Sequence, residues 1–253
     1  MRAVYRTHPG FVREKNEDTV LVDPSGLYII ADGMGGHLAG EIASSMAADS
    51  LKRSLTGVPF GAGALREAIA AANKTIFDKS QTRADFQGMG TTVTLLWIAP
   101  GGAREHGVMI AQLGDSRAYL LRGKCLHRCT RDHSRVDDLL RTKAITPEQA
   151  RVHPERSVIT RALGIKKTAS PDLFGWDRQP GDLWLLCSDG LTNMIDDASI
   201  ASILRGYTID EAADILMREA LNCGGIDNIS LVLVYDGEPG DSGYPIAGKE
   251  ADL

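Results

Sequence analysis

The segment from Leu27 to His37 constrains the fold of this chain most strongly, because an apolar run ends there at a carboxylate followed by glycines. Residues 27–31 are apolar or aromatic and lead directly into Asp32, a pattern typical of a buried strand with the carboxylate at its tip. Gly33 and the glycines after it allow the main chain to approach an ion and turn a carbonyl toward it. An ordinary Asp-Gly turn is the alternative interpretation of this segment taken alone.

Three more aspartates share this context, at boundaries between apolar runs and turns. They are Asp189 in Ser-Asp-Gly, Asp227 in Ile-Asp-Asn and Asp115 in Leu-Gly-Asp-Ser-Arg. A folded sheet sandwich can bring strand ends together, and uncompensated carboxylates at one place would repel unless cations neutralise them. Oxygen ligands select hard ions, so the sequence predicts a site for Mg²⁺ or Mn²⁺ rather than Zn²⁺.

The order of the expected elements favours an α+β fold. Two helices over 39–55 and 64–80 follow the first strands, and a third helix is expected over 208–222. Short polar or glycine-containing links separate the strands between residues 91 and 129, which is typical of antiparallel meanders. We therefore expect a four-layer α-β-β-α sandwich of two antiparallel sheets flanked by helices. The remaining strands are expected over 4–7, 19–23, 170–179, 182–187 and 229–235.

Two segments stand outside this pattern. Residues 134–159 are rich in charge, contain two prolines and carry two short helical patterns, over 136–141 and 147–152, so we expect a mobile flap there. Residues 237–253 are rich in Gly, Pro and charge, which predicts a disordered tail. Residues 1–236 would then form one domain.

Composition excludes several classes of protein. The 253 residues are 43% hydrophobic and carry a formal net charge of −5, without a basic block that would attract nucleic acid or a membrane surface. No apolar run approaches the roughly 20 residues of a membrane span, and the first residues lack a signal-like apolar region. We expect a cytoplasmic protein that acts as a monomer.

The four cysteines do not predict a disulfide framework in a chain of this length. Cys125, His127 and Cys129 alternate along one expected strand and raise a zinc hypothesis. No second Cys/His pair follows at a finger-like spacing, which favours packing or surface positions.

Eight motifs occur in a characteristic order along the chain: REKNED, ADGMGGH, GMGTT, LGDSRAY, RDHS, ITRALG, CSDGL and DNIS. Together they resemble the PP2C-type (PPM) metal-dependent serine/threonine phosphatases, particularly the compact bacterial members. The resemblance covers the chain up to about Asp236.

The resemblance implies a role for each motif. Two core ions, Mn²⁺ or Mg²⁺, would be held by Asp32, Gly33, Asp189 and Asp227, and Asp115 would join Asp189 at a third, weaker ion. Glu17 and Asp18 would support the water shell of the metals, and Arg13 would bind the substrate phosphate. Animal members carry a histidine directly after the glycine where this chain has Met34, so His37 is the candidate acid here.

The expected chemistry agrees with these residue types. Two cations lower the pKa of a shared water toward neutrality, which prepares it to attack phosphorus in line. The leaving alkoxide then needs a proton, from His37 or from a metal-bound water. The resemblance implies phosphorylated serine/threonine proteins as substrates and a cognate bacterial kinase as partner.

The sequence argues against three rival functions and leaves a fourth open. A receiver-type phosphoacceptor would be about half as long and built of alternating β and α units, and a non-catalytic relative would lack a core aspartate. A small-molecule phosphatase is not excluded, because this chemistry is indifferent to what carries the phosphate. A thiol phosphatase built on Cys187 would need a phosphate-cradling loop, which the sequence lacks.

Overall fold

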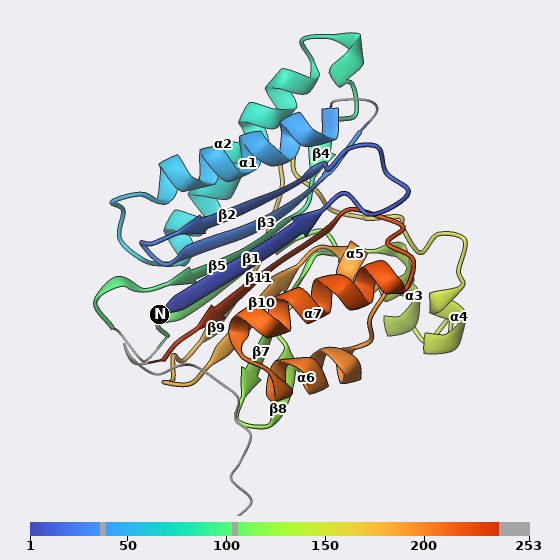
Figure 1. Ribbon diagram of the computed structural model, residues 1–253. Coiled ribbons are helices and arrows are strands. Elements are labelled where there is room, and N and C mark those ends of the chain that lie inside the picture. Colours follow the sequence, from blue (N-terminus) through green and yellow to red (C-terminus); the bar gives the residue numbers. More distant parts are fainter. Residues whose placement is uncertain (36–38, 103–105, 238–253) are drawn as a thin grey trace, which may run out of the picture.

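The computed structural model describes residues 1–35, 39–102 and 106–237. Two antiparallel sheets lie face to face with helices on their outer faces, in four layers (Figure 1). The predicted architecture is confirmed. His37 and the tail beyond residue 237 lie outside the described residues.

One sheet has the strand order β1-β11-β10-β7-β8 and the other the order β2-β3-β5-β6-β9, with the short β4 paired to β3. The first sheet consists of β1 (Arg2–His8), β11 (Ile229–Tyr235), β10 (Leu183–Cys187), β7 (Arg117–Arg122) and β8 (Cys125–Arg128). The second consists of β2 (Asp18–Asp23), β3 (Leu27–Met34), β4 (Gly90–Thr91), β5 (Val93–Ile98), β6 (Val108–Leu113) and β9 (Asp172–Trp176).

The helices divide between the two outer faces. Helices α1 (Ala39–Leu55) and α2 (Ala62–Ser80) cover the sheet of β3, and α6 (Asp197–Gly206) and α7 (Ile209–Asn222) cover the sheet of β11. The short helices are α3 (Arg135–Arg141), α4 (Pro147–Arg151) and α5 (Asp189–Thr192), with single 3₁₀ turns at Ala84–Phe86 and Pro100–Gly102.

Three apolar layers hold these elements together. One lies between α1, α2 and their sheet, one between the two sheets, and one between α6, α7 and the other sheet. The alternation of side chains along each strand supplies both faces, so β3 sends Ile29 toward α1 and Ile30 toward the opposite sheet. Each strand is thereby fixed in register, and where a carboxylate lies at the end of a strand, its position is fixed as well.

Helix α6, which begins at Asp197, was not predicted from the sequence. Asp196 caps this helix by accepting a hydrogen bond from the Ser199 backbone N–H at 2.8 Å. Its serines and β-branched residues are weak helix formers, and Ile200 and Leu204 stabilise it by packing into the core beside α7. The expected strand over 170–179 is also shorter in the structure, at Asp172–Trp176.

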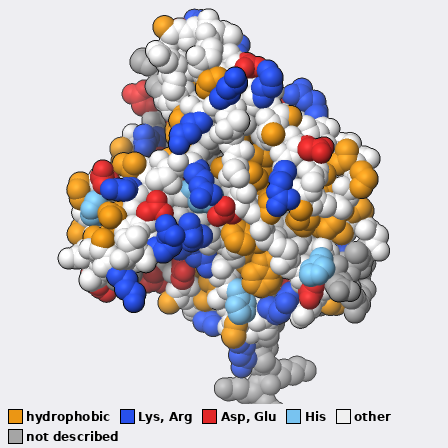
Figure 2. Space-filling view, turned by 180° about the vertical axis from the view of Figure 1, so that it is seen from behind, with side chains coloured by type: hydrophobic (Ala, Val, Ile, Leu, Met, Phe, Trp, Pro, Cys, Tyr) orange, Lys and Arg blue, Asp and Glu red, His pale blue; other side chains and the backbone are white. Residues whose placement is uncertain are grey.

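Within the described ranges, no helix combines the length and the apolar character needed to cross a membrane. The reverse side of the molecule carries basic side chains across its middle, between hydrophobic and uncharged ones (Figure 2).

Candidate metal centre

The structure gathers the predicted aspartates at one end of both sheets. Asp18, the first residue of β2, lies directly across from Asp32 near the end of β3. Asp189 follows β10, Asp227 precedes β11, and Asp115 lies in the turn that joins β6 of one sheet to β7 of the other. Strand ends from both sheets therefore contribute to one acidic cluster.

The cluster is electrostatically strained without a cation. Burial raises the pKa of Asp32 well above its usual value, and the charges of Asp18, Asp189 and Asp115 raise it further. Burial is also the main cause that raises the pKa of Asp18 to about 7 and increases those of Asp115 and Asp189. Opposed carboxylates in adjacent strands are unfavourable, so this end of the fold favours bound positive charge.

The fit to a divalent cation rests on donor type and on one orphaned atom. Asp18 Oδ1 is buried without a hydrogen-bond partner in the described structure. Carboxylate and carbonyl oxygens are the donors that Mg²⁺ and Mn²⁺ prefer. Among the described residues, no three His, Cys, Asp or Glu side chains are arranged so that they alone could hold a metal ion. A cation here would therefore complete its shell with carbonyl and water oxygens.

Close backbone contacts fix Asp32. Its backbone N–H donates to Thr92 Oγ1 at 3.0 Å, and its carbonyl oxygen accepts from Thr91 Oγ1 at 2.9 Å. Gly33 is enclosed so tightly that a Cβ would collide with the backbone oxygens of Glu17 and Gly40. The two threonines of the GMGTT motif thus hold the Asp32 backbone in place.

Arg13 lies beside the cluster and contacts Asp227. Its Nη2 atom donates to Asp227 Oδ2 at 2.8 Å, while 56% of its side chain stays exposed. This hydrogen bond is the largest cause of its raised pKa, and the charges of Glu17 and Asp32 also contribute. The guanidinium therefore faces the cluster and keeps further N–H donors available for an anion.

Asn228 and Ser188 are structural residues of the site that the sequence analysis did not assign. The side chain of Asn228 accepts from Glu17 N–H at 2.8 Å and donates to the carbonyl oxygens of Pro9 and Lys15 at 2.9 and 2.8 Å. Ser188 Oγ donates to Asp18 Oδ2 at 2.8 Å. The fragments DNIS and CSDGL contained both residues, but their partners lie about 170 to 220 positions away in the chain.

His133 connects the flap segment to the Asp115 turn. It is 3% exposed, its Nδ1 accepts from Gly114 N–H at 3.2 Å, and its Nε2 lies 3.0 Å from Asp172 Oδ2. Ser134 and Ile159 pair in an isolated bridge at the base of the flap segment. Helices α3 and α4 occur where the two helical patterns were expected; the mobility of the segment stays a prediction.

The cysteine hypotheses are resolved on structural grounds. Cys187 is fully buried, and burial raises its pKa to about 12, so its thiol stays protonated at neutral pH. Cys129 is buried while Cys125 is exposed, and all four cysteines are free. This agrees with packing and surface positions for these residues.

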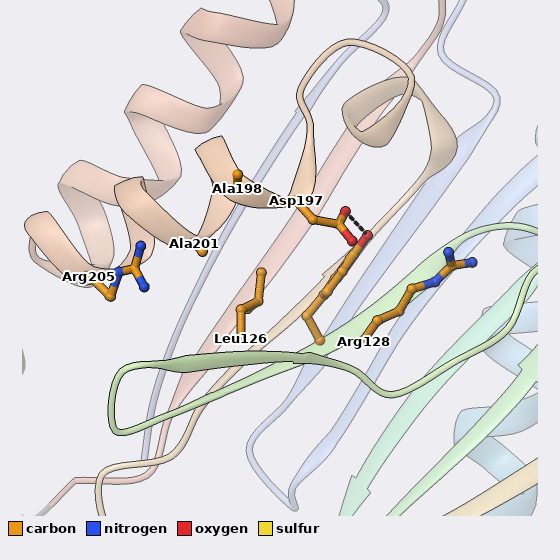
Figure 3. A pocket seen from close by; sticks show the side chains of 7 residues that line it. Leu126, Arg128, Asp197, Ala198, Ala201 and Arg205 are labelled. Atoms are coloured by element: carbon orange, nitrogen blue, oxygen red, sulfur yellow. Dashed lines mark hydrogen bonds between the residues drawn. The ribbon is translucent and has the colours of Figure 1, made fainter. Parts of the chain in front are cut away.

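The structure has a cavity at the end of β3 and another between β8 and α6. One of about 310 Å³ is lined by Met34 at the end of β3 and by residues between Ile159 and Ser170. The other, of about 390 Å³, lies between β8 and α6 and is lined by Leu126 and Arg128 of β8 and by Asp197, Ala198 and Arg205 of α6 (Figure 3). There Tyr119 donates to Asp197 Oδ1 at 2.9 Å. Only the first cavity includes a residue adjacent to the Asp32-Gly33 segment.

Comparison with known proteins gives consistent matches. Residues 13–223 match the family model described as Protein phosphatase 2C. The serine/threonine phosphatase stp of Listeria monocytogenes is 40% identical over 246 residues, which cover 92% of this chain and 95% of that protein.

Solved structures agree with these matches. The crystal structure of the Mycobacterium tuberculosis serine/threonine phosphatase PstP/Ppp has a TM-score of 0.86 and 38% identity, covering 94% of this chain and 99% of that one. The catalytic domain of PstP in complex with two manganese ions has a TM-score of 0.82 and 37% identity, covering 92% and 96%.

Proposed function

Because this chain belongs to the protein phosphatase 2C family, we propose that it is a metal-dependent phosphatase of phosphoserine and phosphothreonine in proteins. The observation that carries the proposal is the acidic cluster, in which carboxylates from both sheets raise one another's pKa at a single end of the fold. Such a cluster matches the needs of divalent cations, and the related PstP domain was crystallised with two manganese ions.

The proposed role of each residue rests on the motifs that this chain shares with the family and is supported by its place in the cluster. Asp32, the Gly33 carbonyl, Asp189 and Asp227 would hold two core ions, either Mn²⁺ or Mg²⁺, which when bound activate a water for attack on phosphorus. Asp115 would contribute to a third ion. Asp18 and Glu17 lie beside these residues and would accept hydrogen bonds from the surrounding water.

Arg13 would bind the phosphate. Its guanidinium presents a planar fork of donors, of which one contacts Asp227, so other N–H groups can bind phosphate oxygens in a bidentate arrangement. This contact would orient the phosphorus toward the cluster. His37 remains the proposed proton donor to the leaving alkoxide.

The names of the related proteins support a proposal for the substrates and the partner of this chain. Proteins named Ser/Thr phosphatases imply phosphoprotein substrates for this chain, and we propose that it opposes a Ser/Thr kinase in the cytoplasm as a monomer. Residues 1–236 would act as one phosphatase domain, with the flap over 134–159 beside the site.

The test is hydrolysis of a phosphothreonine peptide with Mn²⁺, with Mg²⁺ and with a chelator. We expect turnover only with a divalent cation, and a loss of at least about a hundredfold for Asp189→Asn, which removes charge but keeps shape. The matched control is Asp177→Asn, on a residue that lies outside the cluster. Full turnover in excess chelator, or normal turnover by Asp189→Asn, would contradict the proposal.

A further inference from the structure

The cavity beside Met34 has a preformed apolar wall. Ile165 is 43% exposed, and it packs closely over Gly90, where an added Cβ would lie only 2.6 Å from Ile165 Cδ1. Leu113 and Ile159 also line the cavity, together with the methyl group of Ala169. An exposed isoleucine packed beside a concave apolar surface is a feature that a ligand can use.

Hydrogen bonds make this wall rigid. Thr91 and Leu163 exchange two backbone hydrogen bonds, of 3.1 and 2.9 Å. The buried Asn73 accepts from Gly164 N–H at 2.9 Å and donates to the carbonyl oxygens of Lys166 and Lys167, both at 3.1 Å. The loop that carries Ile165 is therefore held in place before any ligand arrives, which lowers the entropic cost of binding.

The charge at the rim is positive. Arg161 lines the cavity, and its Nη1 atom is paired with Asp172 Oδ1 at 2.8 Å. Lys166 also lines the cavity and has no carboxylate within ion-pair distance among the described residues. A peptide that carries a phosphate would meet complementary charge here.

The distance to the acidic cluster sets which substrate residue can reach the cavity. Met34 comes two residues after Asp32 on β3, a separation of about 7 Å at the rise of a strand. An extended peptide advances at most about 3.3–3.6 Å per residue along its length. A side chain within about three positions of the phosphorylated residue therefore matches this separation.

We propose that this cavity binds an apolar side chain, of the size of leucine or isoleucine, within three positions of the phosphoserine or phosphothreonine. The cavity volume of about 310 Å³ accommodates one such side chain. This inference rests on the proposed phosphatase function and adds a sequence preference to it: apolar residues close to the phosphate, favoured over polar ones of the same size.

The test compares phosphothreonine peptides that carry Leu or the similarly sized Asn at each of the three positions on either side of the phosphate. For the wild-type protein with Mn²⁺, we expect kcat/KM to favour Leu over Asn by roughly tenfold to a hundredfold at one position or more. Ala169→Phe fills the cavity and Ile165→Asn makes its wall polar. Both should reduce that ratio to about one. Thermal melts check that each variant folds, and Ile165→Asn carries the test alone if Ala169→Phe does not fold.

The matched control is Ala198→Phe, the same substitution in the cavity between β8 and α6, and it should leave the Leu/Asn ratio unchanged. A wild-type ratio near one at all six positions overturns the proposal, as does an unchanged ratio in the folded cavity variants. In either case, metal-dependent hydrolysis of the peptides would leave the phosphatase function standing. Absence of hydrolysis of every peptide would instead overturn the phosphatase function and the cavity proposal together.

Discussion

The metal-free protein should become more stable as pH falls from 8 to 5, because its buried carboxylates are raised in pKa. The sign follows from linkage: a carboxyl whose pKa is higher in the folded than in the unfolded state binds more protons when folded, so protonation favours folding. Asp18 has a pKa of about 7 in the folded protein and near 4 in the unfolded chain, so its contribution to stability changes as the pH falls from 8 to about 4.

The magnitude can be worked from Asp18 alone. A pKa of about 7 in the fold and about 3.9 in the unfolded chain corresponds to a rise of roughly 2–3 kcal/mol in the free energy of unfolding between pH 8 and pH 5. For a chain of this size that is a rise of about 5–10 °C in Tm. Asp32, Asp115 and Asp189 act in the same direction.

The assay is thermal or urea unfolding of chelator-treated protein across this pH range, with and without Mn²⁺. Saturating Mn²⁺ should raise the stability at pH 8 and reduce the slope, since the cation binds only the folded cluster. Asp18→Asn should make the metal-free slope shallower, and the other raised carboxylates of the cluster should supply what remains. Asp23→Asn is the matched control, because the hydrogen bonds from Ser25 hold the pKa of Asp23 at about 2, outside this window. Equal stability of the wild-type protein at pH 5 and pH 8, or a slope in Asp18→Asn as steep as that of the wild type, would refute the reasoning.

Three further predictions concern side chains around the cluster. Arg13→Ala should raise KM for a phosphopeptide at least about tenfold, while Mn²⁺ binding measured by calorimetry persists. Arg13→Lys should recover little of the loss, because lysine lacks the planar fork of donors. A loss of Mn²⁺ affinity in Arg13→Ala would show that Arg13 has a different role. Asn228→Ala should destabilise the fold by about 2–4 kcal/mol in urea unfolding and weaken Mn²⁺ binding, since it removes three partly buried hydrogen bonds to backbone groups of the N-terminal loop. Asn228→Asp, which keeps the acceptor, should lose less, and equal losses would count against this account. His133→Asn keeps an acceptor near the Nδ1 position for Gly114 N–H, whereas His133→Gln does not. His133→Asn should therefore cost about 1–3 kcal/mol less stability than His133→Gln. The reverse order in urea unfolding would show that this hydrogen bond is not the contact by which His133 stabilises the fold.

The local pattern of the sequence determined the elements that carry the chemistry. Apolar runs that lead into Asp32 and Asp189, and one that follows Asp227, predicted strands with carboxylates at their ends, and the structure has all three at such boundaries. Gly33 was expected to allow close approach, and it is enclosed by backbone oxygens. These features were readable because strand periodicity, turn composition and carboxylate position are properties of neighbouring residues.

Only the tertiary structure decided which of these residues meet. Asp18 lies opposite Asp32 because the register of β2 against β3 pairs them, and Asn228 holds the loop of Glu17 from more than 200 residues away. Helix α6 escaped prediction because core packing rather than its weak intrinsic propensity stabilises it. The cavity beside Ile165 likewise depends on contacts with Gly90 that no local pattern specifies. Hydrogen bonds and packing between distant segments have no period in the sequence, so they become visible only when the sheets have formed and closed around the cluster.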